Sequence, residues 1–146
     1  MGNEENRVTP AALLERLTAE HRRLDDLFGQ LLAAMSAGDA AAAGAASQAF
    51  DETLRSHTRT EEEEIFPPVP EQKLAPLLDE DSSRRLYREL RLEHVQIREL
   101  SGMIRRLLSE GARLDEIPGL AANLARRWDA HTTREEREGF SLLSGS

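Results

Sequence analysis

Apolar residues recur at alternating spacings of three and four along most of the chain, a pattern typical of amphipathic α-helices. Four segments carry it, at residues 9–35, 39–66, 81–111 and 115–139. The first begins with a capping threonine and a proline at the first helical position. The second is stopped by three prolines in residues 67–70, which end a helix because proline lacks the N–H and clashes with the preceding turn. A connection with one short helical turn, over residues 71–78, is expected to follow.

The apolar stripes are long enough to form a shared core. The first helix presents Leu14, Leu17, Leu24, Phe28, Leu31 and Met35, and the third presents Leu86, Leu90, Ile97, Ile104 and Leu108. Short links between long amphipathic helices favour antiparallel neighbours. We therefore predict an all-α fold, an antiparallel up-down-up-down four-helix bundle over residues 9–143. Residues 1–8 are expected to form a disordered N-terminal tail and residues 144–146 a C-terminal tail.

The chain contains an internal repeat. Residues 20–29 align with residues 93–102, sharing Glu, His, Leu and Gly, and residues 57–66 align with residues 131–140, sharing His, Thr, Glu and Phe. The chain therefore resembles two helical hairpins of similar design. All four histidines fall at matching places in the two copies, a coincidence that surface chemistry does not readily produce.

The amino-acid composition limits the metal donors and the binding partners that the chain can have. The 146 residues include no cysteine, so a metal can be held only by nitrogen and oxygen donors. The formal net charge of −8 argues against a nucleic-acid surface, and the arginine doublets are interleaved with acids as on a solvated helix face. The polar N-terminus does not resemble a signal peptide, and no apolar run approaches a membrane span. We expect a cytoplasmic protein that binds neither membrane nor nucleic acid and is a monomer or a weak homodimer.

Each predicted helix interrupts its apolar stripe with a polar residue at mid-length. His21 lies between Leu17 and Leu24, and His94 lies between Leu90 and Ile97. The inward row of the second helix contains Phe50, Leu54, His57, Glu61 and Ile65, and that of the fourth contains Leu120, Leu124, Trp128, His131 and Glu135. Buried imidazoles and carboxylates without partners cost several kcal/mol. A shared metal removes that penalty, so metal binding is strongly favoured over four separately satisfied core histidines.

The HxxxE spacing has a geometric reason. Residues four apart lie on one helix face, roughly 6 Å apart along the axis, so both side chains reach one ion or bridge two. In this bundle the second and fourth helices are diagonal and parallel, so Glu61 and Glu135 point to one level of the core. The expected product is two metals, each with two histidines, bridged by the two glutamates. Mixed imidazole and carboxylate donors suit iron, manganese or zinc.

This combination resembles the hemerythrin-like, or HHE cation-binding, family. The residues that carry the resemblance are His21, the HxxxEE motif and the Ile-Phe-Pro of residues 57–67, Glu93-His94, and HxxxEE with a nearby Phe in residues 131–140. It covers residues 14–143. The resemblance implies two non-haem iron ions with carboxylate and oxo or hydroxo bridges. It also implies that His21, His57, His94 and His131 are terminal ligands and that Glu61 and Glu135 are bridges.

The chain departs from the oxygen-carrying members of that family at one ligand. Those members have a further histidine one turn before the position of His94, where this chain has Leu90. The second bridging acid also follows His131 by four residues rather than five. We therefore expect an open coordination position, for a small ligand or for Glu62, Glu136 or Tyr87. For Tyr87 a packing role is favoured, and Trp128 and Phe66 are expected to cover the site as core residues.

The leading functional hypothesis is a soluble di-iron protein that binds or senses a small oxidant, namely dioxygen, nitric oxide or peroxide. A peroxide-decomposing or other oxidative enzyme using the same centre is an alternative, as is a protein of iron storage or homeostasis. A binding protein is favoured over an enzyme because nothing else in the sequence resembles a substrate pocket. A metal-free interaction bundle is the remaining possibility.

Overall fold

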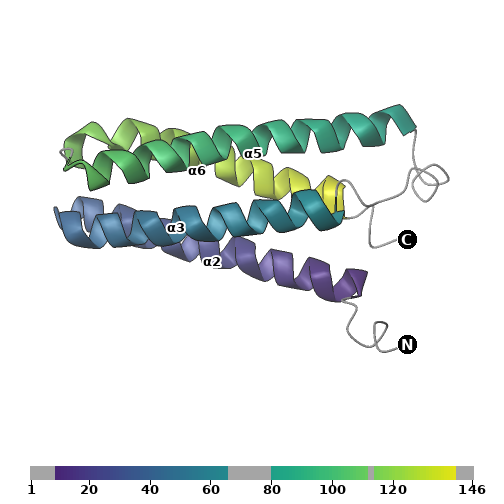
Figure 1. Cartoon of the computed structure of the whole chain (residues 1–146), viewed down its shortest axis with the longest axis horizontal. Helices are drawn as coiled ribbons and strands as arrows, with labels where there is room; N and C mark the ends of the chain where they lie inside the picture. The colour runs from purple at the N-terminus through teal and green to yellow at the C-terminus, as the bar shows by residue number, and fades with distance from the viewer. Residues whose placement is uncertain (1–8, 66–79, 112–113, 141–146) are drawn as a thin grey trace.

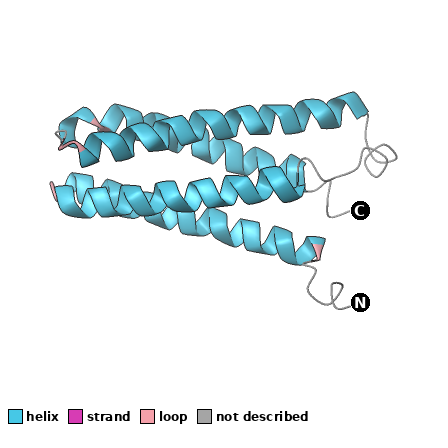
Figure 2. Ribbon diagram, viewed as in Figure 1, coloured by secondary structure: helices cyan, strands magenta, loops and turns pink. Residues whose placement is uncertain are grey.

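A computed structural model describes residues 9–65, 80–111 and 114–140. These residues form four long helices and no strand (Figures 1 and 2). The helices are α2 (Pro10–Ser36), α3 (Ala40–Thr60), α5 (Glu80–Ser109) and α6 (Pro118–Arg134), with short segments η1 (Glu61–Ile65), η2 (Leu114–Glu116) and η3 (Glu135–Gly139). The prediction of an all-α four-helix bundle is confirmed. The predicted tails at 1–8 and 144–146, the proline stop and the 71–78 connection lie outside the described residues, and the 9–143 domain bounds stay a prediction.

The first hairpin follows the expected sequence rules. Thr9 caps α2, its hydroxyl oxygen accepting from the Ala12 N–H at 3.1 Å. The helix ends in a tight turn at Gly38, whose φ of 71° is the left-handed conformation that glycine adopts without strain. Asp39 then caps α3, accepting from the Ala42 N–H at 3.0 Å. The short turn through Gly38 and the cap at Asp39 therefore place α2 and α3 as antiparallel neighbours.

The second hairpin differs from the expectation at the start of its second helix. The fourth helix was expected to begin at residue 115, but Asp115 lies in the 3₁₀ turn η2 and α6 begins at Pro118. Ile117 stands at the capping position without a side-chain cap bond. It is fully buried, and Pro118 supplies the fixed φ that suits a first helical position. Burial of Ile117 and the proline therefore decide the helix start, rather than a capping carboxylate.

The four helices alternate in direction, α2 and α5 running one way and α3 and α6 the other (Figure 1). Two apolar clusters fill the space between them. The larger cluster contains Leu24, Phe50, Ile97, Leu124 and Trp128, among others, and the smaller one contains Leu17, Ile65, Tyr87, Leu90 and Phe140. The histidines come between the two clusters along every helix. Across the described ranges, none of the helices is both long and apolar enough to cross a membrane.

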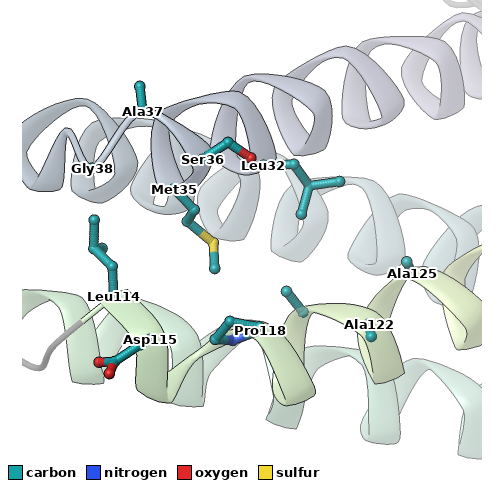
Figure 3. A pocket seen from close by; sticks show the side chains of 11 residues that line it. Leu32, Met35, Ser36, Ala37, Gly38, Leu114, Asp115, Pro118, Ala122 and Ala125 are labelled. Atoms are coloured by element: carbon teal, nitrogen blue, oxygen red, sulfur yellow. The ribbon is translucent and has the colours of Figure 1, made fainter.

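A hollow of about 800 Å³ opens between the end of α2 and the start of α6 (Figure 3). Met35 and Leu114 point into it from opposite sides. Small residues of α6, among them Ala122 and Ala125, line the rest of the α6 side. The six predicted metal ligands are not among its lining residues, so this hollow is distinct from the metal centre.

Candidate metal centre

The six predicted ligand residues come together in the interior of the bundle. Each is at most 2 % exposed, and together they come from α2, α3 with η1, α5, and α6 with η3. Their donor atoms form two groups, and within each group the atoms lie within 4.8 Å of one another. The first pocket comprises His21, His57, Glu61 and Glu135, and the second pocket comprises His94, His131, Glu61 and Glu135. The two glutamates belong to both pockets.

Each shared glutamate turns one oxygen toward each pocket. Glu61 Oε2 lies 3.2 Å from His57 Nε2, whereas its Oε1 lies 3.0 Å from His94 Nε2. Glu135 Oε1 lies 2.9 Å from His21 Nε2, whereas its Oε2 lies 3.1 Å from His131 Nε2. With one oxygen on each side, either glutamate could serve as a ligand in both pockets at once. Each pocket then offers two imidazole nitrogens and two carboxylate oxygens.

The chemistry of these donor atoms fits a metal better than it fits a hydrogen-bond network. The Nε2 atoms of His21, His57 and His131 and all four carboxylate oxygens of Glu61 and Glu135 are buried and make no hydrogen bond of good geometry. Leaving one such group unsatisfied costs about 1–3 kcal/mol, and more when it is charged. Seven such atoms are divided between the two adjoining pockets, where a metal would satisfy them. Two divalent cations would satisfy them and neutralise the two carboxylates.

A ring of four further carboxylates surrounds the histidines. Each Nδ1 donates to a glutamate on a neighbouring helix, since an ionised carboxylate can only accept. The pairs are His57 with Glu20 at 2.7 Å, His21 with Glu136 at 2.7 Å, His131 with Glu93 at 2.7 Å, and His94 with Glu62 at 2.8 Å. Each pair joins two helices: α3 to α2, α2 to the η3 end of α6, α6 to α5, and α5 to the η1 end of α3. The ring orients every imidazole so that Nε2 is left to face a metal.

Arginines hold part of this ring in place. Arg98 of α5 donates to Glu62 at 2.9 Å and to the Thr58 hydroxyl at 3.0 Å. Arg134 of α6 donates to Glu93 at 2.8 Å and also pairs with Glu89. These bonds join different helices, so they fix Glu62 and Glu93 within the bundle. These two glutamates, with Glu20 and Glu136, are the outer carboxylates of the centre.

Without a metal, the buried histidines and glutamates pair with one another, and this pairing shifts their pKa values. Burial alone would lower the pKa of His21, but the close carboxylates of Glu135 and Glu61 outweigh it and raise that pKa to about 10. The same competition raises the pKa of His94 to about 11. Burial would raise the pKa of Glu135, whereas its contacts with Glu61 and the histidines hold it well below 4.5. Protons therefore occupy the histidines when the metals are absent, and a metal must displace them.

Both bridging glutamates stand where a regular helix widens into a π-helical turn. The turn η1 begins at Glu61 and η3 begins at Glu135. In both, the three residues after the glutamate lie toward the outside and the fourth, Ile65 or Gly139, is buried again. Such turns occur frequently at functional sites. The matching π-turns were not predicted from the sequence, because periodicity does not separate a π-turn from an α-turn over five residues.

Apolar side chains close the centre on both sides. The Trp128 ring lies 5.5 Å from the His21 ring, and its Nε1 donates to Asp25 at 2.7 Å. On the opposite side Phe140 stacks on His21 at 5.8 Å. The expected covering role of Trp128 matches this placement, whereas Phe66 lies outside the described residues. Tyr87 is 7 % exposed within the smaller apolar cluster, and burial raises its pKa to about 12, as suits a packing residue.

The six residues predicted as ligands lie together in the structure, but the roles of the surrounding carboxylates were not predicted. Glu62 and Glu136 were candidates for an open coordination position, and the structure instead places them on the Nδ1 atoms of His94 and His21. The parts played by Glu20 and Glu93 were not foreseen. The one available signal was the repeat, in which Glu-His and Glu-Glu pairs recur at matching positions, but it does not say which helix holds the partner of each glutamate.

Comparison with known proteins agrees with this geometry. The family model for the hemerythrin HHE cation binding domain matches residues 12–143. Comparison with curated proteins and with solved structures gives no match. Together with the two buried His/Glu groups, the family match indicates a metal-binding site.

Proposed function

The chain belongs to the hemerythrin HHE cation-binding domain family, and on that premise we propose that it is a non-haem di-iron protein that binds or senses a small oxidant. The oxidant class comprises dioxygen, nitric oxide and peroxide. The observation that carries this proposal is the sharing of Glu61 and Glu135, each of which gives one oxygen to each pocket. Carboxylates placed in this way hold two ions as one unit.

The donor set supports iron as the resident metal. Each pocket supplies two imidazole nitrogens and two carboxylate oxygens, a mixture suited to iron, manganese or zinc rather than to calcium or magnesium. The chain has no cysteine to compete for a softer metal. Iron would supply, when bound, a redox-active centre that responds to small oxidants, whereas zinc has no redox chemistry. Manganese and zinc suit the same donors and are the alternative metals.

The residues around the centre support a small ligand. Two imidazole nitrogens and two carboxylate oxygens per pocket would leave room in the coordination shell for a ligand from solution. Leu90 occupies the place where oxygen-carrying relatives have a further histidine, and it is fully buried. Trp128 and Phe140 add to an apolar wall that excludes bulky or charged molecules. The protein's own part is therefore to hold the metals, orient the imidazoles and restrict entry.

Anaerobic loading followed by ligand addition tests the proposal. Metal-free protein is loaded with ferrous iron, and its absorption spectrum is recorded before and after addition of dioxygen, nitric oxide or hydrogen peroxide. We expect new charge-transfer bands in the unsubstituted protein and in Glu63→Ala, which alters an exposed neighbour of Glu61 on η1. Glu61→Ala should lose these bands. If the spectrum of the iron-loaded protein is unchanged by all three oxidants, the proposed function is refuted. Sustained consumption of hydrogen peroxide would instead favour the oxidative enzyme.

A further inference from the structure

The outer carboxylates of the two pockets are anchored to different extents. In the second pocket, Glu62 is held by Arg98 and Glu93 by Arg134, both through bonds between helices. In the first pocket, Glu20 is bonded by Arg16 of its own helix at 3.3 Å, and the Arg16 side chain is 50 % exposed. An exposed pair of this kind contributes little to stability.

Glu136 is the least restrained member of the ring. Its side chain is 42 % exposed, compared with 29 % for Glu62, its counterpart in the second pocket. Within the described ranges, His21 is the one polar partner recorded for Glu136. The imidazole of His21 is therefore oriented by a carboxylate that is itself free to move into solvent.

The internal repeat shows that this difference is built into the sequence. Arg98 follows His94 by four residues, and the residue four after His21 is Asp25. Arg134 follows His131 by three residues, and the residue three after His57 is Thr60. The first copy of the repeat therefore has no arginine at either matching position. Neither Asp25 nor Thr60 can donate to a carboxylate as arginine does. Asp25 accepts a bond from Trp128 instead.

Outer-shell partners determine how well a histidine is positioned for its metal, and losing one typically costs 10–100-fold in metal affinity. We propose that the two pockets are unequal, the second holding its ion tightly and the first holding its ion weakly enough to exchange. Arg98 and Arg134 are the positioning residues that create the difference. The proposal rests on the proposed function, since it requires both pockets to bind metal.

A matched pair of variants separates the two pockets. His21→Ala damages the first pocket and leaves the second intact, whereas His94→Ala, at the equivalent place in the repeat, does the reverse. Each metal-free variant is titrated with Co²⁺ by calorimetry, with the absorption of bound Co²⁺ as a second readout and circular dichroism as a check of folding. We expect His21→Ala to bind Co²⁺ at least about tenfold more tightly than His94→Ala. Equal affinities, or the reverse order, would overturn the proposal.

Substitution of an anchor tests the cause. Arg98→Gln should weaken Co²⁺ binding about tenfold in the His21→Ala background and leave it unchanged in the His94→Ala background. A merely structural contribution of Arg98 would lower both affinities equally, which would refute its assigned role. Arg106→Gln, which alters an exposed arginine further along α5, is the control for loss of charge. Failure of the unsubstituted protein to bind Co²⁺ would instead refute the metal-binding function itself.

Discussion

Trp128 is the residue through which the larger apolar cluster reaches the metal centre. Its ring lies 6.1 Å from Phe50 on one side and 5.5 Å from His21 on the other, and its Nε1 donates to Asp25. Trp128→Phe keeps an aromatic ring but removes that donor and some buried volume. We expect a loss of about 1–2 kcal/mol in the free energy of unfolding, measured by urea denaturation. Asp25→Asn, which keeps an acceptor, should cost less, and an unchanged stability of Trp128→Phe would contradict this role.

Single residues also show how far the sequence predicts the site. The four histidines and two bridging glutamates could be chosen because each interrupts an apolar stripe, which is a local pattern. The outer carboxylates could not, because Glu20 or Glu93 looks like any half-exposed acid until the neighbouring helix is placed beside it. Their partners are set by tertiary packing between helices, which no local pattern contains.

At the scale of the helices, α2 contains a substitution site that should raise stability. Gly29 lies in the helix interior, is exposed, and has open space where a Cβ would be added. Glycine in such a position costs about 0.5–1 kcal/mol relative to alanine. Gly29→Ala should therefore raise the free energy of unfolding by about that amount in urea denaturation.

Gly139 provides the matched contrast within η3. A Cβ added there would lie 3.3 Å from Leu90 Cδ1, in the core next to the centre. Gly139→Ala should therefore gain less than Gly29→Ala, because close packing offsets the gain in helix propensity. A larger gain at Gly139 than at Gly29 would show that Leu90 moves freely, contrary to the tight packing described here.

The four long helices were predictable because inward-facing residues recur at helical spacing along each of them. The residues at which these helices begin and end were harder to predict. The start of α6 is decided by the burial of Ile117 and by Pro118, three residues after the start expected from the sequence. The π-turns that begin at Glu61 and Glu135 contain the same residue types as an ordinary helical turn, so the sequence did not predict them. Long-range periodicity thus determines the architecture, and packing determines where each element ends.

For the whole molecule, metal binding and folding should be linked through pH. The pKa values of His21 and His94 in the metal-free fold are raised to about 10 and about 11 from 6.5, because carboxylate bonds outweigh the effect of burial. A raised pKa stabilises the fold fully below about pH 6.5, and that contribution is lost as the pH rises through the folded-state values. Bound metal instead requires neutral imidazoles, so its stabilising effect grows with pH.

We therefore expect the melting temperature of the metal-free protein to fall between about pH 6.5 and about pH 10. The difference between the metal-loaded and metal-free melting temperatures should widen over the same range. Thermal melts at several pH values, with and without bound metal, measure both quantities. A difference that stays constant or narrows with rising pH would show that the histidines do not exchange protons for metal.

The central claim is that this bundle holds two ions in one shared centre. Native mass spectrometry of the protein after anaerobic loading with ferrous iron and removal of excess metal counts those ions directly. The arrangement of Glu61 and Glu135 between the pockets predicts two iron ions per chain, and Glu63→Ala should retain both. No bound iron, or a single ion under saturating metal, would contradict the shared centre.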